Sequence, residues 1–192
     1  MSQTTLDIKE PGLNVLPPGV ERHVVNAGGL TGLQIFPDDE IEIINDEGNQ
    51  ICEIICFDKN GKSELGILNL KENSKKSFIK EILNNNNESS LITKLQLKKR
   101  NLNISNSKSS VIFDKDTPSG EKVKLKSKDK CYVIFSAPKN EMLISDQNPS
   151  SNLTIFIKRA KINKDKELSI IPDPIYDPSY EKNIDRQTCI SY

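Results

Sequence analysis

The sequence predicts a mainly β fold, a β-sandwich or a barrel-like sheet with one short helix. Short stretches in which apolar and polar residues alternate recur at regular spacing along the chain. Glycine, proline, asparagine and aspartate separate these stretches, while helical periodicity is evident only over residues 74–83. Alternation with a period of two is typical of strands that bury one face, and many such strands at even spacing indicate a sandwich or barrel.

The chain begins with a lead-in over residues 1–20 that is predicted to be extended. It contains three prolines and a glycine in Pro11, Pro17, Pro18 and Gly19. Proline fixes φ and donates no backbone hydrogen bond, which disfavours a helix. Strands are then expected over 21–29 and 30–36, with Gly28 and Gly29 interrupting the first of them.

Residues 39–48 give a clear local signal. Ile41 and Ile43 alternate with glutamates, which predicts a strand with one buried face. The following residues, 45–48, tolerate a left-handed φ, so we expect a hairpin turn here.

The return strand is expected over residues 50–57. Ile51 to Cys56 are apolar on both faces except for Glu53, which predicts a central strand of the sheet. Asp58 to Gly61 form the next predicted turn.

One helix is predicted, with Ser74 as its N-cap. Its apolar stripe is formed by Phe78, Ile79, Ile82 and Leu83, which share one helix face. The asparagine run 84–87 ends it, at a length of about 10 residues.

The rest of the chain is predicted to add short strands and turns, giving about nine strands in all. The expected strands span residues 91–97, 102–104, 110–116, 121–127, 130–138 and 152–160. The lysines of 122–130 alternate with Val123 and Leu125, as expected for a solvated strand face.

Composition limits the classes of function. The 192 residues contain 27 basic and 27 acidic side chains, so no overall positive charge favours nucleic-acid binding. No apolar run is long enough for a transmembrane helix, and the N-terminus has no signal-peptide pattern. The sequence therefore predicts a cytoplasmic protein that binds neither nucleic acid nor membrane.

The four cysteines, expected to be reduced thiols, show no metal-ligand spacing. Cys52 and Cys56 share a strand face but lie ~13 Å apart at roughly 3.3 Å per residue, which is too far to bind one metal ion. We interpret both as buried small apolar residues, and Cys131 as core. Cys189 lies in the C-terminal tail and has no assigned place.

No other residue carries a clear chemical role. His23 is the only histidine, and no partner that would make it a general base is identifiable. Gly28-Gly29 precede a strand instead of opening a helix, so they do not predict a phosphate cradle. The acidic residues of 38–40 and 46–47 are too few and too closely spaced for a calcium loop and are interpreted as turn and cap residues. The sequence thus assigns no catalytic, cofactor-binding or metal-binding residue.

The domain organisation is predicted to end in an unfinished unit. Residues 21–163 form the β-rich module, and 164–192 read as a proline-punctuated linker followed by the first strand of a missing second module. We therefore expect the chain to be the front part of a longer protein.

Three stretches carry a resemblance to a known family. Residues 37–54 resemble the strand–turn–strand signature of the urea-carboxylase-associated domain family. Residues 171–192 are similar to the proline-rich lead-in of that domain in longer enzymes, which fuse it to an aminomethyltransferase-like domain of the glycine-cleavage T-protein type. Residues 137–159 resemble the closing strand pair of the N-terminal module in the trimethylamine N-oxide demethylase type.

The resemblance implies that this chain is a non-catalytic N-terminal module of such an enzyme. For the full-length parent it implies zinc and tetrahydrofolate, bound by other modules, with formaldehyde passed to the folate domain. Residues 50–53 read Gln-Ile-Cys-Glu where the zinc-binding module of the family tends to read Gln-Cys-x-Asp, so no cofactor site is expected in this chain. The expected partner is the remainder of the parent polypeptide or a companion subunit. The alternative is a free-standing β module that binds a small ligand.

Overall fold

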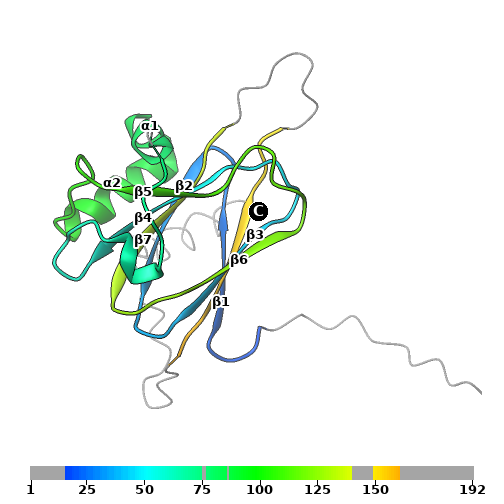
Figure 1. The fold of residues 1–192 in the computed structure, drawn as a ribbon. Helices are drawn as coiled ribbons and strands as arrows, with labels where there is room; N and C mark the ends of the chain where they lie inside the picture. The colour runs from blue at the N-terminus through cyan, green and yellow to red at the C-terminus, as the bar shows by residue number, and fades with distance from the viewer. Residues whose placement is uncertain (1–15, 75–76, 86, 140–148, 161–192) are drawn as a thin grey trace, which may run out of the picture.

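Two four-stranded antiparallel sheets form the framework of the computed structural model, which describes residues 16–74, 77–85, 87–139 and 149–160 (Figure 1). The first sheet has the order β1 (Val20–Val25), β8 (Leu153–Lys158), β3 (Glu40–Asn45) and β6 (Glu121–Lys126). The second has the order β2 (Gly29–Ile35), β7 (Cys131–Ala137), β4 (Cys52–Asp58) and β5 (Ser109–Phe113). The predicted mainly β, sandwich-like fold is confirmed.

The chain passes repeatedly from one sheet to the other. Among the strands described, β4 and β5 are the one pair of chain neighbours that also hydrogen-bond to each other. The hairpin predicted at residues 45–48 is therefore wrong, because β3 and β4 lie in different sheets. Gly48 and Asn49 do have left-handed φ angles of 79° and 56°, but they carry the chain across the sandwich instead of back along one sheet.

The main core lies between the two sheets and follows the period-two pattern of the strands. The inward-facing residues of β3 and β8 are isoleucines and a leucine, and those of β4 and β7 include three cysteines. β4 is a central strand, as predicted, and its residues Cys52 to Phe57 are all buried.

Helices cover the outer face of the second sheet (Figure 1). They are α1 (Phe78–Asn84) and α2 (Glu88–Lys99), and a 3-10 helix, η1 (Leu65–Leu68), follows β4. A second apolar cluster fills the space between these helices and the sheet, with Phe57, Ile79 and Ile134 fully buried within it.

The number and position of the helices differ from the prediction of one helix capped by Ser74. α1 is capped by Ser77, whose hydroxyl accepts a hydrogen bond from the Lys80 amide. α2 occupies the stretch 91–97, which was predicted to be a strand.

The error over 91–97 has a physical cause in the pattern of burial. The residues of α2 that face the protein are Ser90, Thr93, Gln96 and Leu97, which have helical spacing but are mostly polar. Leu91 and Leu95 are 48% and 62% exposed. The leucines of 91–97 therefore alternate as in a strand without marking a buried face.

Residues 102–104 are not a strand. Asn101 has φ 52° and the Leu102 amide donates to the Leu97 carbonyl, which closes the end of α2. Leu102 and Ile104 instead pack at the border of the second apolar cluster. The other predicted strands between residues 20 and 160 are confirmed, with ends shifted by at most four residues.

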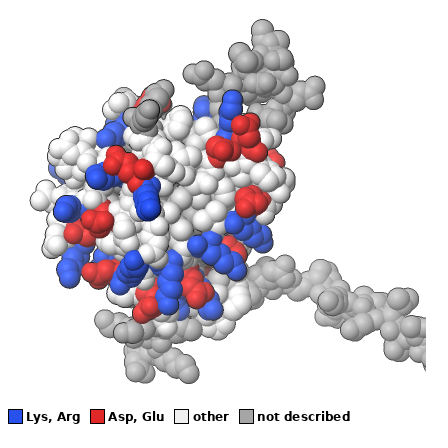
Figure 2. Space-filling model, viewed as in Figure 1, with Lys and Arg blue, Asp and Glu red and all other residues white. Residues whose placement is uncertain are grey.

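Charges of both signs are mixed over the surface seen in Figure 2. Lys122, Lys124 and Lys126 are exposed on β6, as expected for a solvated strand face. Lys124 pairs with Glu42 at 3.3 Å and Lys126 with Asp38 at 3.0 Å, so the local basic run is partly neutralised. Within the described residues, no helix is long and apolar enough to span a lipid bilayer.

Candidate functional site

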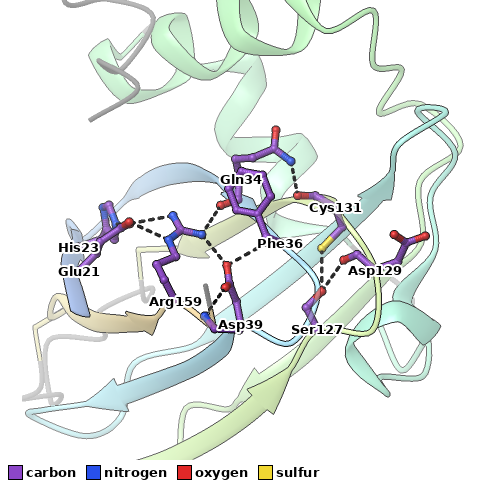
Figure 3. A network of polar contacts seen from close by, with 10 residues as sticks. Glu21, His23, Gln34, Phe36, Asp39, Ser127, Asp129, Cys131 and Arg159 are labelled. Atoms are coloured by element: carbon purple, nitrogen blue, oxygen red, sulfur yellow. Dashed lines mark hydrogen bonds and ion pairs between the residues drawn. The ribbon is translucent and has the colours of Figure 1, made fainter. Parts of the chain in front are cut away.

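A network of polar side chains at one edge of the sandwich is centred on Arg159, directly after β8 (Figure 3). Its guanidinium group makes a two-pronged contact with Glu21 of β1, with Nε–Oε1 and Nη2–Oε2 distances of 2.7 and 2.8 Å. Nη1 donates to Asp39 Oδ2 at 2.7 Å and to the Gln34 carbonyl at 2.9 Å. We call these residues, Glu21, Gln34, Asp39 and Arg159, the Arg159 clasp.

Asp39 is the buried anchor of the clasp, with only 2% of its side chain exposed. Its carboxylate also accepts hydrogen bonds from the amides of Phe36 and Ala160, at 2.9 and 3.0 Å. Charge-assisted bonds of this kind compensate for burying the carboxylate. The clasp therefore joins β1, the end of β2, the turn before β3 and the end of β8.

His23 lies beside the clasp on β1. Its Nε2 is 3.1 Å from Glu21 Oε2, and because the two residues are two positions apart on a strand they point to the same side. The sequence suggested no partner for this histidine, and the structure supplies Glu21. A hydrogen bond from His23, together with the guanidinium of Arg159, lowers the pKa of Glu21 to about 2.

The charges of the clasp compensate one another. Burial works against the charge of Arg159, but bonds to Glu21 and Asp39 outweigh it and raise the guanidinium pKa. Each Arg159 nitrogen has an acceptor within the protein. Such an arrangement suits a structural tie better than an anion-binding site, because the guanidinium is already occupied.

The three described cysteines are core residues, as predicted. Cys52, Cys56 and Cys131 belong to the cluster between the sheets and are at most 1% exposed. The Cys131 sulfur lies 3.6 Å from the Ser127 hydroxyl. The neighbouring Cys131 thiol and burial raise the pKa of Cys56, and burial raises that of Cys52, so neither is a reactive thiolate. Cys189 lies outside the described residues.

The acidic and glycine-rich stretches lie in turns and at the strand ends beside them. Glu40 pairs with Lys158 and Asp38 with Lys126, while Asp46 accepts a hydrogen bond from the Thr154 hydroxyl at 2.7 Å. Gly28, with φ 75°, lies in the turn between β1 and β2. Over the residues with described positions, no group of three or more histidine, cysteine, aspartate or glutamate side chains could hold a metal ion.

Glu53 is a buried carboxylate to which the sequence gave no role. It points from β4 toward helix α1 and is fully buried, and its Oε2 accepts a hydrogen bond from the Ile79 amide at 2.7 Å. Burial raises the pKa of this carboxyl group. The signal in the sequence was a single acidic residue in an otherwise apolar central strand, and the structure identifies it as a support for the start of α1.

Comparison with known proteins gives one strong sequence match. The chain is 31% identical over 185 residues to the trimethylamine-oxide aldolase of Ruegeria pomeroyi. The match includes 96% of this chain but only 23% of the aldolase, so the chain spans about a quarter of the length of this relative. No model of a known protein family matches the chain.

Among solved structures, the chain is similar to a DUF1989 family protein from Silicibacter pomeroyi. The sequence identity is 8% and the TM-score 0.43, over 74% of this chain and 80% of that protein. At these values the match does not define a shared fold. The chain is thus similar, along nearly its whole length, to one part of a much longer aldolase.

Proposed function

We propose that this chain is a structural module of a longer enzyme that acts on methylated amines such as trimethylamine N-oxide. The observation that carries the proposal is the 31% identity over 96% of the chain to a trimethylamine-oxide aldolase of which it spans only 23%. On this proposal, the module supplies a rigid β framework, and the catalytic groups come from the remainder of the polypeptide or from a companion subunit.

The described side chains support a framework role. The Arg159 clasp is satisfied internally, and the described cysteines are buried in the main core. The zinc implied for the parent enzyme does not fit these residues, because no metal-binding group of three occurs in the described ranges. We therefore assign the zinc to another module of the parent, and the family resemblance implies that tetrahydrofolate belongs to the aminomethyltransferase-like domain. The urea-carboxylase-associated and aminomethyltransferase-like assignments, and a cytoplasmic location, remain predictions.

The experiment compares this chain alone with the full-length aldolase of Ruegeria pomeroyi. Both proteins are purified, their folded state is checked by circular dichroism, and zinc is measured by elemental analysis. Formaldehyde release from trimethylamine N-oxide is then followed. We expect the isolated chain to fold, to retain no stoichiometric zinc after dialysis and to release no formaldehyde.

Three results would contradict the proposal. Stoichiometric zinc in the isolated chain, or turnover of the N-oxide by it, would place catalytic groups within this module. A ligand-dependent rise of Tm with methylated amines would favour a free-standing binding module, since a ligand at a hundredfold excess over Kd stabilises by about 2.7 kcal/mol.

A further inference from the structure

A second polar cluster lies inside one end of the sandwich, apart from the Arg159 clasp. Asn45, the last residue of β3, follows the inward-facing series of Ile41 and Ile43 and is fully buried. Its Nδ2 donates to the Gln50 carbonyl at 3.0 Å. Its Oδ1 is buried and has no hydrogen-bond partner among the described residues.

Gln50 is the centre of this cluster and is also fully buried. Its Nε2 donates to the carbonyls of Pro138 and Ile51, at 2.9 and 3.0 Å, and its Oε1 accepts from the Ser151 amide at 2.8 Å. Pro138 follows β7 and Ser151 precedes β8. The side-chain amide of Gln50 therefore hydrogen-bonds to both Pro138, after β7, and Ser151, before β8.

Ser151 presents the second unpaired oxygen of the cluster. The residue is 5% exposed, and its Oγ has no hydrogen-bond partner in the described part of the chain. Asn45 Oδ1 and Ser151 Oγ are thus two buried oxygens that no other described residue pairs, and both residues hydrogen-bond to Gln50. Buried polar atoms are nearly always paired, so two exceptions around one residue require an explanation.

Reversing the Asn45 amide does not remove the problem. Reversal would bring Oδ1 toward the Gln50 carbonyl, so that two acceptors would face each other and the Nδ2 donors would be unpaired. No described residue supplies the hydrogen-bond donors that these two oxygens need. Asn45, Gln50 and Ser151 are all uncharged, which favours a neutral donor over a cation.

We propose that Asn45, Gln50 and Ser151 form a buried hydration site, in which ordered water donates hydrogen bonds to Asn45 Oδ1 and to Ser151 Oγ. Native proteins contain about one such water per ~27 residues, each typically making about three hydrogen bonds. The site lies where the chain crosses from β3 to β4 and where β7 and β8 are joined. The bound water completes the polar network that links residues 45–50 to Pro138 and Ser151.

A crystal structure of the whole chain at a resolution that shows ordered water tests the site directly. We expect water density within hydrogen-bonding distance of Asn45 Oδ1 and of Ser151 Oγ. Absence of water at either oxygen, or a protein donor taking its place, would overturn the proposal.

The variant Ser151→Ala provides an independent test by urea unfolding. If water is bound, removing the hydroxyl breaks a hydrogen bond and lowers the unfolding midpoint. If the site is dry, the change removes an unpaired buried group, so the midpoint stays or rises, and the proposal fails. The control is Ser90→Ala, because Ser90 is fully buried and its hydroxyl donates to the Ile82 carbonyl at 2.6 Å. The unfolding midpoint of this control variant should fall, since a known hydrogen bond is removed.

Discussion

The Arg159 clasp gives the sharpest prediction about stability. Replacing Arg159 with methionine keeps the apolar stem but removes the guanidinium from Glu21 and Asp39. Asp39, with 2% of its side chain exposed, would keep two backbone donors and lose its cation. Leaving a buried charge without its partner is the costly part of breaking an ion pair.

The magnitude follows from the burial of the two carboxylates. Removing one partner of a fully buried pair costs about 3–5 kcal/mol. Glu21 is 37% exposed, so water screens its contact with Arg159 and its share is at most about 1 kcal/mol. Because Arg159 itself is 19% exposed and the pair is not fully buried, we expect a total loss at or just below this range, about 2–3 kcal/mol of unfolding free energy.

The assay is urea unfolding followed by circular dichroism, since the chain contains no tryptophan for fluorescence. The matched control is Lys158→Met, one residue earlier, whose side chain is 69% exposed and pairs with Glu40 at 3.6 Å. The control should lose less than about 1 kcal/mol. Equal losses for the two variants would refute the reasoning that Asp39 is a buried charge dependent on Arg159.

Three further predictions rest on other parts of the fold. The lowered pKa of Glu21 stabilises the folded state at pH values above 4.5, the ordinary pKa of a glutamate, and this stability is lost as the pH falls toward about 2. In acid titrations, the variant Glu21→Gln should therefore lose less stability than the unmodified chain between pH 4.5 and about 2. The variant Gly32→Ala places a methyl group against the Tyr132 hydroxyl, which should lower the free energy of unfolding by about 1–3 kcal/mol. This loss should be smaller in a chain that also carries Tyr132→Phe, and an equal loss would contradict the contact. Cys52 and Cys56 should resist iodoacetamide in the folded chain and react after denaturation, as measured by peptide mass spectrometry; labelling of either thiol in the native state would show that the core opens.

The candidate functional residues show a clear limit of sequence interpretation. The burial of Cys52, Cys56 and Cys131 was predictable because they sit in apolar strands, where a small thiol behaves as an apolar group. Arg159 was not identifiable as the centre of a network. Its partners Glu21 and Asp39 lie 138 and 120 residues away in the chain, and no local pattern records such contacts.

The sequence by itself determined where most strands lie and which of their faces are buried. Side chains alternate across a strand with a fixed period, so Ile41 and Ile43 mark an inward face without any tertiary information. A second local pattern predicted a central strand over residues 50–57, because both of its faces are apolar except at Glu53, and β4 is such a strand. These properties depend on backbone geometry and on the removal of apolar surface from water, and both are local in the chain.

Only the tertiary structure decided how the strands pair and which polar residues become buried. The turn at residues 45–48 has the residues of a hairpin, but the chain crosses to the other sheet because β3 hydrogen-bonds to β6 and β8 instead of β4. Residues 91–97 became helical because Thr93 and Gln96 are buried against the second sheet despite their polarity. Strand order and the burial of polar residues depend on contacts between residues far apart in the chain. Alternative sets of such contacts compete with one another, and they leave no periodic pattern in the sequence.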